Sequence, residues 1–410
     1  MKKLLLVLLI LSLFINHLNA NEKDLQIIQK DKKEYRLLDK ESIQTRQQSQ
    51  KYDWISPIDL SGNIGRNHSF SDENSRNLNN KNTKSASIGF TQSIFESGGI
   101  GFKMDYADNR FKYEMLSWEN QNSQLIYTIY NTLLDIKKLN LEIKQNEYRI
   151  VNKDIELIIK KIQYEAGKTD IIELNNAIMS KNLILKEEIA LKNSLKEKEQ
   201  ELAKYTDLKY DEIEILDFQE TNKEIFLDKN YSILEADAKV EMLNSEYKIK
   251  KSQYLPKLSL SAKASYSSQD EKFNSMINDT NKDDATSSGS LILSMPLYDY
   301  TKSSKIQESK IEVLKQKALV NDLKNETAFE YEQIFTKIDT YLKQNETINK
   351  NIKLYEELIG ANKISSEAGM TSKYDLEILE NTKTINEFDI LINKINILQQ
   401  YAKLYFKIKN

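Results

Sequence analysis

The sequence predicts a mainly α-helical protein with a small β part, in which long antiparallel coiled-coil helices accompany two β-hairpins. Gly and Pro are rare, with 10 Gly and 3 Pro among 410 residues, well below the ~12% that these two residue types usually contribute together. Few turns and long, uninterrupted helices are therefore expected. Apolar residues at coiled-coil spacing and two regions of period-two alternation support the same fold class.

Residues 1–20 are predicted to form a signal peptide. Lys2 and Lys3 give a basic start, an apolar run of 12 residues follows over residues 4–15, and Ala20 suits cleavage. The run is shorter than the ~20 residues that a membrane-spanning helix needs. This pattern is typical of an export signal that is removed from the mature chain.

The first hairpin is expected at about residues 54–100. This region is rich in Ser, Asn, Gly and Thr, and its apolar residues alternate with polar ones, which favours strands with one apolar and one wet face. The polar stretch 66–84 is then expected to be the loop that closes the hairpin. The alternating apolar positions are Ile58, Leu60, Ile64, Ala86, Ile88, Phe90 and Ile94.

Long helices are expected after this hairpin. Residues 102–166 and 168–255 contain no Gly or Pro, and a helix over most of residues 103–164 would be ~90 Å long at ~1.5 Å per residue. Apolar residues that step by three and four favour helices that pack side by side. One such series is Tyr148, Val151, Ile155, Ile158 and Ile162, and another is Phe388, Leu391, Ile395, Leu398, Ala402 and Tyr405.

The second half of the chain has the same order of elements. A second hairpin is expected at about residues 256–298, with its loop at 268–287, and it is followed by stretches without Gly or Pro at 297–359 and 370–410. Its alternating apolar positions are Leu258, Leu260, Ala262, Ala264, Tyr266, Leu291, Leu293, Met295 and Leu297.

A short motif relates the two halves. Glu165-Ala166-Gly167 recurs 202 positions later as Glu367-Ala368-Gly369, so the tips of two helix pairs are expected at residues 164–169 and 366–371. We therefore expect two structural repeats over residues 21–229 and 230–410, each with a helix, a hairpin and a long helix pair.

The composition excludes several kinds of chemistry. The chain has no Cys and only two His, His17 and His68, so thiolate zinc sites, cysteine nucleophiles and multi-His metal centres are not expected. The 59 Lys and Arg nearly balance the 62 Asp and Glu, which does not suit a nucleic-acid-binding protein. We expect no enzymatic activity, no cofactor and no metal, because no nucleophile–base or metal constellation is visible.

The hairpins suit a membrane-spanning sheet. Strands of ~10 residues that alternate in this way are typical of outer-membrane barrels, but bacterial barrels have at least about eight strands and two hairpins supply only four. An open edge in lipid would leave backbone groups unpaired. The barrel is therefore expected to be shared between copies, and three copies would supply twelve strands.

With these features the sequence resembles the TolC-type outer-membrane efflux proteins. The resemblance rests on the signal peptide, the duplicated halves, Tyr164-Glu165-Ala166-Gly167, Glu367-Ala368-Gly369, and the segments Tyr254-Leu255-Pro256-Lys257-Leu258-Ser259-Leu260 and Ser294-Met295-Pro296-Leu297-Tyr298. It implies a homotrimer with a 12-stranded barrel in the lipid of a Gram-negative outer membrane and an α-helical barrel in the periplasm. It also implies a passive exit duct of a tripartite efflux or secretion system, coupled through a periplasmic adaptor (membrane fusion) protein to an inner-membrane transporter.

The resemblance also implies site residues. An acidic residue six positions after the second tip glycine falls on Asp375, whereas the family's second carboxylate falls on Ile378 and Glu377 lies next to it. We assign Asp375 and Glu377 to a periplasmic aperture. We assign the helix tips to adaptor docking, through Tyr164, Ala166, Gly167, Ala368 and Gly369.

Several alternatives remain at this point. Asp375 also suits the first turn of a solvated helix, and the tip glycines also suit ordinary helix ends with positive φ. An exported coiled-coil scaffold without a pore would explain the heptads but not the two hairpins. A periplasmic adaptor would be expected to carry a Gly-rich module beside one helical hairpin, which 10 Gly and two equivalent halves do not favour.

Overall fold

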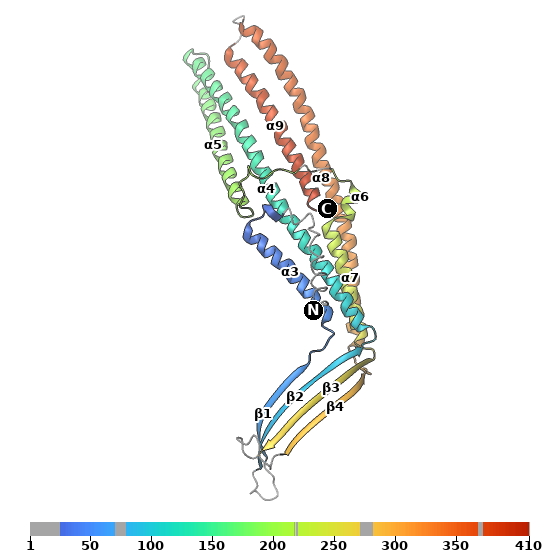
Figure 1. The fold of residues 1–410 in the computed structure, drawn as a ribbon. Coiled ribbons are helices and arrows are strands. Elements are labelled where there is room, and N and C mark those ends of the chain that lie inside the picture. The colour runs from blue at the N-terminus through green and yellow to red at the C-terminus, as the bar shows by residue number, and fades with distance from the viewer. Residues whose placement is uncertain are drawn as a thin grey trace, which may run out of the picture. The chain divides into compact units, whose positions relative to one another are not determined.

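A computed structural model describes residues 25–69, 79–216, 218, 220–270, 282–367 and 372–409. The predicted signal peptide, residues 1–20, lies outside them. The described residues form long helices and one four-stranded antiparallel sheet (Figure 1), which confirms the predicted fold class. None of the described helices carries an apolar stretch of membrane-spanning length. The elements are η1 Leu25–Ile27, α3 Lys30–Tyr52, β1 Asp59–Ser69, β2 Asn79–Phe95, α4 Gly99–Glu165, α5 Ile171–Leu202, α6 Lys223–Asp228, α7 Tyr231–Ser252, β3 Lys257–Asp270, β4 Lys282–Ser294, α8 Lys302–Glu367 and α9 Lys373–Tyr405.

The chain divides into two compact units, and each takes residues from both halves of the sequence. Of the described residues, those within 41–115 and 236–320 form the sheet unit, and those within 25–40, 116–235 and 321–409 form the helical unit. Each half contributes the order helix, hairpin, helix, helix. The division into repeats at residues 21–229 and 230–410 stays a prediction.

The sheet unit is organised around the strand order β1-β2-β3-β4. Strands β2 and β3 join the two halves of the sequence, and Ile88 lies opposite Ala264 in their register. A register shift between Ser93 and Phe95 marks an irregularity near the end of β2. Because β1 and β4 each have one strand neighbour, both outer edges of the sheet leave backbone groups unpaired within the chain.

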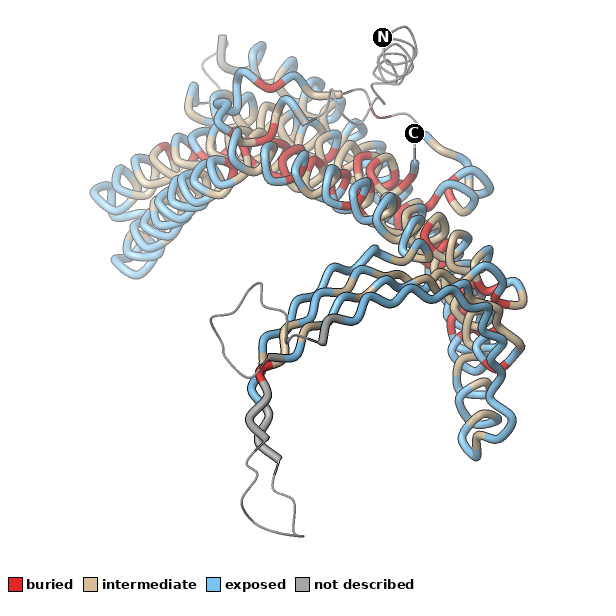
Figure 2. The backbone as a smooth tube through the Cα atoms, turned by 60° about the horizontal axis from the view of Figure 1, so that its bottom comes forward, coloured by how far each residue is buried: buried red, intermediate tan, exposed pale blue. Residues whose placement is uncertain are grey.

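The helical unit has a conventional apolar core. Ile129, Leu133 and Leu134 on α4 have no exposed surface. A second cluster joins α6, α8 and the C-terminal segment through Phe226, Ile334, Ile338, Leu404 and Ile408. Figure 2 shows buried positions gathered along these helices, whereas the strands are mainly exposed or intermediate.

The strands are longer than predicted, and the loops predicted at 66–84 and 268–287 are correspondingly wrong at their ends. Strand β1 continues to Ser69 and β2 already begins at Asn79. Strand β3 continues to Asp270, and β4 begins at Lys282. These segments are polar on both faces, so no alternation marks them, but backbone pairing continues because it does not depend on the side chains.

The last strand, β4, ends earlier than the sequence predicts. The alternation predicted a strand through Met295 and Leu297, whereas β4 ends at Ser294. Pro296 follows directly, and a proline cannot donate a backbone hydrogen bond to a neighbouring strand.

Candidate functional site

The sheet has one apolar face. The strand register places Leu60 opposite Ile88 and Leu260 opposite Leu291, so their side chains project to the same side. Leu60 and Leu293 are 79% and 72% exposed, which is unusual for large apolar side chains in such a continuous group. The apolar side chains on this face include Leu60, Ile64, Ala86, Ile88, Phe90, Leu258, Leu260, Ala262, Ala264, Tyr266, Leu291 and Leu293.

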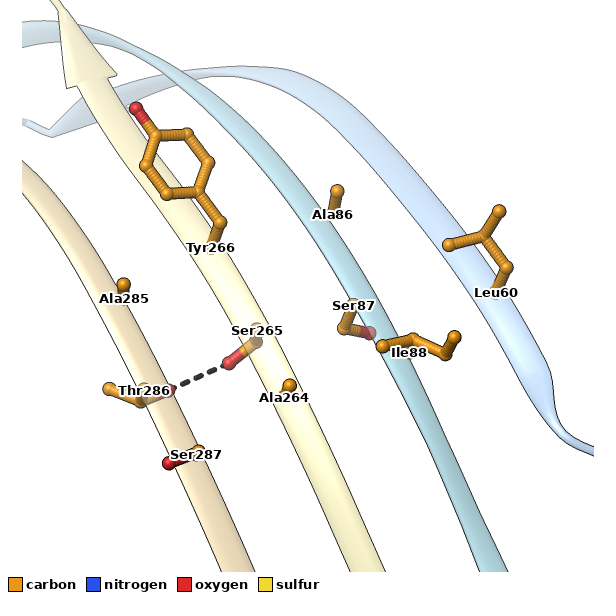
Figure 3. A pocket seen from close by; sticks show the side chains of 10 residues that line it. All are labelled: Leu60, Ala86, Ser87, Ile88, Ala264, Ser265, Tyr266, Ala285, Thr286 and Ser287. Carbon is orange, nitrogen blue, oxygen red and sulfur yellow. Dashed lines mark hydrogen bonds between the residues drawn. The ribbon is translucent and has the colours of Figure 1, made fainter.

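The close-up in Figure 3 shows how the four strands contribute to this region. A shallow hollow of about 440 Å³ is lined by side chains that include Leu60, Ala86, Ile88, Ala264 and Tyr266. It is open and mainly apolar. No charged side chain lines it, so it offers bulk apolar contact rather than a specific polar site.

The opposite face of the sheet is covered with hydroxyl groups. Ser61 Oγ and Ser87 Oγ lie 2.8 Å apart, and Ser265 Oγ lies 2.8 Å from Thr286 Oγ1, the second pair being drawn in Figure 3. A further cross-strand pair joins Thr91 to Ser261 at 3.0 Å. Pairs of this kind satisfy one another across neighbouring strands and keep the face hydrophilic.

The apolar face has the dimension of a membrane-spanning band. On β3 it runs from Leu258 to Tyr266, which is ~27 Å along the strand at ~3.4 Å per residue. Strands of membrane barrels tilt by ~35–45°, so this length would cover roughly 20 Å of bilayer, close to the usual apolar band of ~25 Å.

The first helix tip is built around Gly167. This residue follows the end of α4 and has φ +67°. The N–H of Gly167 donates to Tyr164 O at 2.9 Å, and the N–H of Lys168 donates to Gln163 O at 2.8 Å, which is the Schellman pattern of helix termination. The structural reading of Gly167 is therefore confirmed, whereas a docking role stays a prediction.

Tyr164 and Ala166 are exposed beside this turn. Asp170 then caps α5, because its Oδ1 accepts a hydrogen bond from the N–H of Glu173 at 2.9 Å. Lys160 donates to Glu173 across the tip at 2.5 Å. The tip thus presents small and aromatic side chains on a turn that is closed by local hydrogen bonds.

At the second tip, Ala368 and Gly369 lie outside the described residues. Asp375 lies in the first turn of α9, as the simpler reading of the sequence expects, and it is exposed. Glu377 is exposed on the same helix. Glu380 pairs with Lys363 of α8 at 3.5 Å. The aperture assignment of Asp375 and Glu377 stays a prediction.

A polar seam between α4 and α9 was not predicted. Gln145 donates from Nε2 to Asp389 Oδ1 at 2.6 Å and to the carbonyl oxygen of Ile385 at 2.9 Å. Asn152 accepts a hydrogen bond from Asn381 Nδ2 at 2.9 Å. Gln145 and Asn152 are buried, so these contacts fix how the two helices align.

The acidic side chains of the described residues do not form a metal site. No group of three or more His, Asp or Glu there could hold a metal ion. The carboxylates at helix interfaces instead pair with lysines, as Glu330 does with Lys403 and Lys407.

Comparison with known proteins identifies relatives of this fold. Residues 224–403 match the family described as "Outer membrane efflux protein". No curated protein matches the sequence. The structure of the Campylobacter jejuni CmeC outer membrane channel is similar with a TM-score of 0.70 at 12% identity, over 92% of this chain and 84% of that chain.

Two further structures show the same likeness. The outer membrane protein VceC from Vibrio cholerae gives a TM-score of 0.71 at 13% identity, over 94% of this chain and 93% of that chain. The open state of the Neisseria gonorrhoeae MtrE outer membrane channel gives 0.67 at 11% identity, over 94% and 87%. The fold shared with these structures and the family match over residues 224–403 confirm the resemblance to the TolC-type outer-membrane efflux proteins that the sequence predicts.

Proposed function

We propose that the protein is the outer-membrane exit duct of a tripartite efflux or secretion system, a passive channel and not an enzyme. The two-faced sheet is the observation that carries this function. Its apolar face exposes Leu60 by 79% and Leu293 by 72%, and such a surface is stable in lipid rather than in water. The hydroxyl face then borders the aqueous path.

The functional unit is a homotrimer. The sheet has open edges at β1 and β4, and unpaired backbone groups in lipid would each cost several kcal/mol. Pairing of β4 with β1 of the next copy removes both edges. Three copies supply twelve strands, which satisfies the minimum for a membrane barrel.

Exposed apolar stripes on the helices support the same assembly. On α5, Ile172, Met179 and Leu183 are 64%, 61% and 66% exposed. On α8, Leu354 and Leu358 are 57% and 48% exposed at an i, i+4 spacing. We assign both stripes to packing between neighbouring copies in a periplasmic helical barrel, since side chains at such spacing form a continuous helix face.

Two groups of residues at or near the helix tips have proposed roles. Asp375 and Glu377 form an acidic periplasmic aperture, where threefold repetition of carboxylates would favour cations. Tyr164, Ala166, Gly167, Ala368 and Gly369 form the tips that dock a periplasmic adaptor protein. The adaptor joins the duct to an inner-membrane transporter, which supplies the energy.

The alternative function is an exported coiled-coil scaffold without a pore. It would use the helices in the same way, but it provides no occupant for the exposed apolar face of the sheet. The proposed function gives that face a lipid environment.

The decisive experiment combines fractionation, gel migration and conductance. We expect the protein in the outer-membrane fraction, as a trimer that dissociates on heating, and we expect the purified trimer to conduct ions in a planar bilayer. A monomer in the soluble fraction without conductance would overturn the proposal.

A second experiment tests the aperture. Asp375→Ala should reduce the cation preference of the channel, whereas Asp339→Ala, an exposed change on α8, should not. Equal cation preference in both variants would remove the role of Asp375.

A further inference from the structure

The hydroxyl face of the sheet contains one row that differs from the rest. The strand register aligns Asp59 with Gly89 and Gly89 with Lys263, so a carboxylate and an ammonium group lie at the same level of this face. The register of the described strands places four other charged residues on this face, all toward its ends: Lys81, Lys257, Lys282 and Asp284. The rows between carry Ser, Thr, Gly, Asn and one Ile.

The two charges are separated by a position without a side chain. Asp59 and Lys263 are two strands apart, which places their backbones roughly 10 Å from each other. A Cβ atom added to Gly89 would lie 3.0 Å from Ala262 O and 3.3 Å from Lys263 Cγ. The aliphatic part of the Lys263 side chain therefore lies close to Gly89 of β2, in space that a side chain at position 89 would restrict.

The hydroxyl groups beside Asp59 and Lys263 pair with one another and do not neutralise the two charges. Ser61 and Ser87 pair with each other, as do Thr91 and Ser261. Among the described residues, no ion pair within 4.0 Å joins Asp59 to Lys263. Both side chains are exposed at a hollow of about 460 Å³ on this face, where they are available to a solute.

We propose that Asp59 and Lys263 form a charge-separated contact site for solutes that carry both an ammonium group and a carboxylate or phosphate group. Asp59 contacts the cationic group, Lys263 contacts the anionic group, and the hydroxyl groups around them contact the polar remainder. Opposite charges held apart on the wall of a confined aqueous path set up a local field that orients a dipolar solute.

This inference rests on the proposed function, because the site acts on passing solutes only if the hydroxyl face lines the duct. In a trimer the row would repeat three times, giving alternating acidic and basic groups at one level of the wall. Its net charge is zero, so it would favour dipolar solutes without strongly favouring either simple cations or simple anions.

The test compares single and double neutralisations in channels of confirmed trimeric state. We expect Lys263→Gln to raise the cation-to-anion permeability ratio in a KCl gradient by about twofold and Asp59→Asn to lower it by a similar factor. The double variant should regain the wild-type ratio. In liposome swelling, however, it should lose the faster entry of a zwitterionic dipeptide relative to an uncharged sugar of similar size.

Lys84→Gln is the matched control, since it removes the same charge from the opposite face of β2. The chain has no Cys, so Lys263→Cys offers a second test that labels channels after they have inserted. A cationic thiol reagent should restore the wild-type permeability ratio, and an anionic reagent should shift it further toward cations.

Conducting trimers in which the variants at positions 59 and 263 leave both the permeability ratio and the dipeptide preference unchanged would overturn the site but not the channel. A wild-type trimer that never conducts would overturn the proposed function and this inference with it.

Discussion

In the helical unit Leu133 and Phe226 have no exposed surface, whereas in the sheet Leu60 is 79% and Leu293 is 72% exposed. The helical unit thus stabilises itself by burying apolar side chains within the chain. In the sheet, the apolar side chains lie on one face and remain exposed. The difference indicates that the sheet depends on its surroundings for a stabilisation that the helices supply internally. Under the proposed function, those surroundings are lipid and neighbouring copies.

The largest expected effect tests the internal core. Phe226→Ala removes a fully buried ring that packs against Ile334 and Leu404, and it should destabilise the helical unit by about 3–5 kcal/mol. Leu293→Ala is the control, because its side chain is already 72% exposed and its loss leaves no cavity within the chain. Thermal unfolding followed by circular dichroism should show a much lower midpoint for Phe226→Ala alone; equal midpoints would break the comparison.

The next effect tests the external environment of the sheet. Leu291 and Ser290 are neighbours on β4 that face opposite sides. Leu291→Arg should cost about 2–4 kcal/mol in a bilayer, because it places a charge against lipid, whereas Ser290→Arg projects into the aqueous path and should cost little. The measurement is the yield of heat-sensitive trimer in the outer membrane. A lower yield for Ser290→Arg than for Leu291→Arg would reverse the assignment of the two faces.

The sequence predicts well those helices and strands whose residue pattern and structure arise from the same physical cause. Of the stretches without Gly or Pro, 102–166 lies almost wholly in α4 and 297–359 lies mostly in α8, because nothing in them ends a helix. The stretch 168–255, by contrast, is divided among α5, α6 and α7. The alternation around Leu258 and Tyr266 became β3, because a two-sided environment imposes period two. The sequence does not predict strand ends such as residues 79–84, because polar residues at every position leave no alternating pattern.

The candidate sites were predicted less completely, again for physical reasons. Gln145 and Asn152 have the polarity of solvated helix positions, and only their partners on α9 make them interhelical contacts. Asp59 and Lys263 lie 204 positions apart in the sequence, and only the strand register brings them to one level. A pattern within one segment carries no information about either pairing.

A smaller effect concerns the electrostatics of the helical unit. Glu330 lies 2.8 Å from Lys403 Nζ and 2.5 Å from Lys407 Nζ. Burial would by itself raise the pKa of Glu330, but the hydrogen bonds from Lys403 and Lys407 outweigh it and hold the pKa below its ordinary value. Because the folded pKa is lowered, the stabilisation is present above the unfolded-chain pKa of ~4.3 and is lost as the pH falls through the folded value.

Glu330→Gln should therefore destabilise the helical unit by about 1 kcal/mol at neutral pH. Its difference from the wild type should shrink as the pH falls below ~4. Glu332→Gln is the matched control on the same helix, since its ion pair with Lys223 is largely exposed, at 60% and 42%, and it should change stability by only a few tenths of a kcal/mol. Unfolding curves at neutral and acidic pH measure both variants. A constant gap between Glu330→Gln and the wild type across this range would contradict the assignment.

The smallest effects are expected at two glycines, one directly after α4 and one inside α8, where a substitution changes the backbone but not the packing. A Cβ atom added to Gly167 or Gly360 would meet no atom within 4 Å, so each substitution acts through the backbone alone. Gly167 has φ +67°, and Gly167→Ala should destabilise the tip by about 1 kcal/mol. Gly360 lies inside α8, and Gly360→Ala should stabilise its helix by about 0.5–1 kcal/mol. Hydrogen exchange of peptides around each site should speed up for Gly167→Ala, by about fivefold for 1 kcal/mol, and slow down for Gly360→Ala. Slower exchange in both variants would mean that the turn at Gly167 relaxes out of its left-handed conformation, and it would contradict the strain expected at this position.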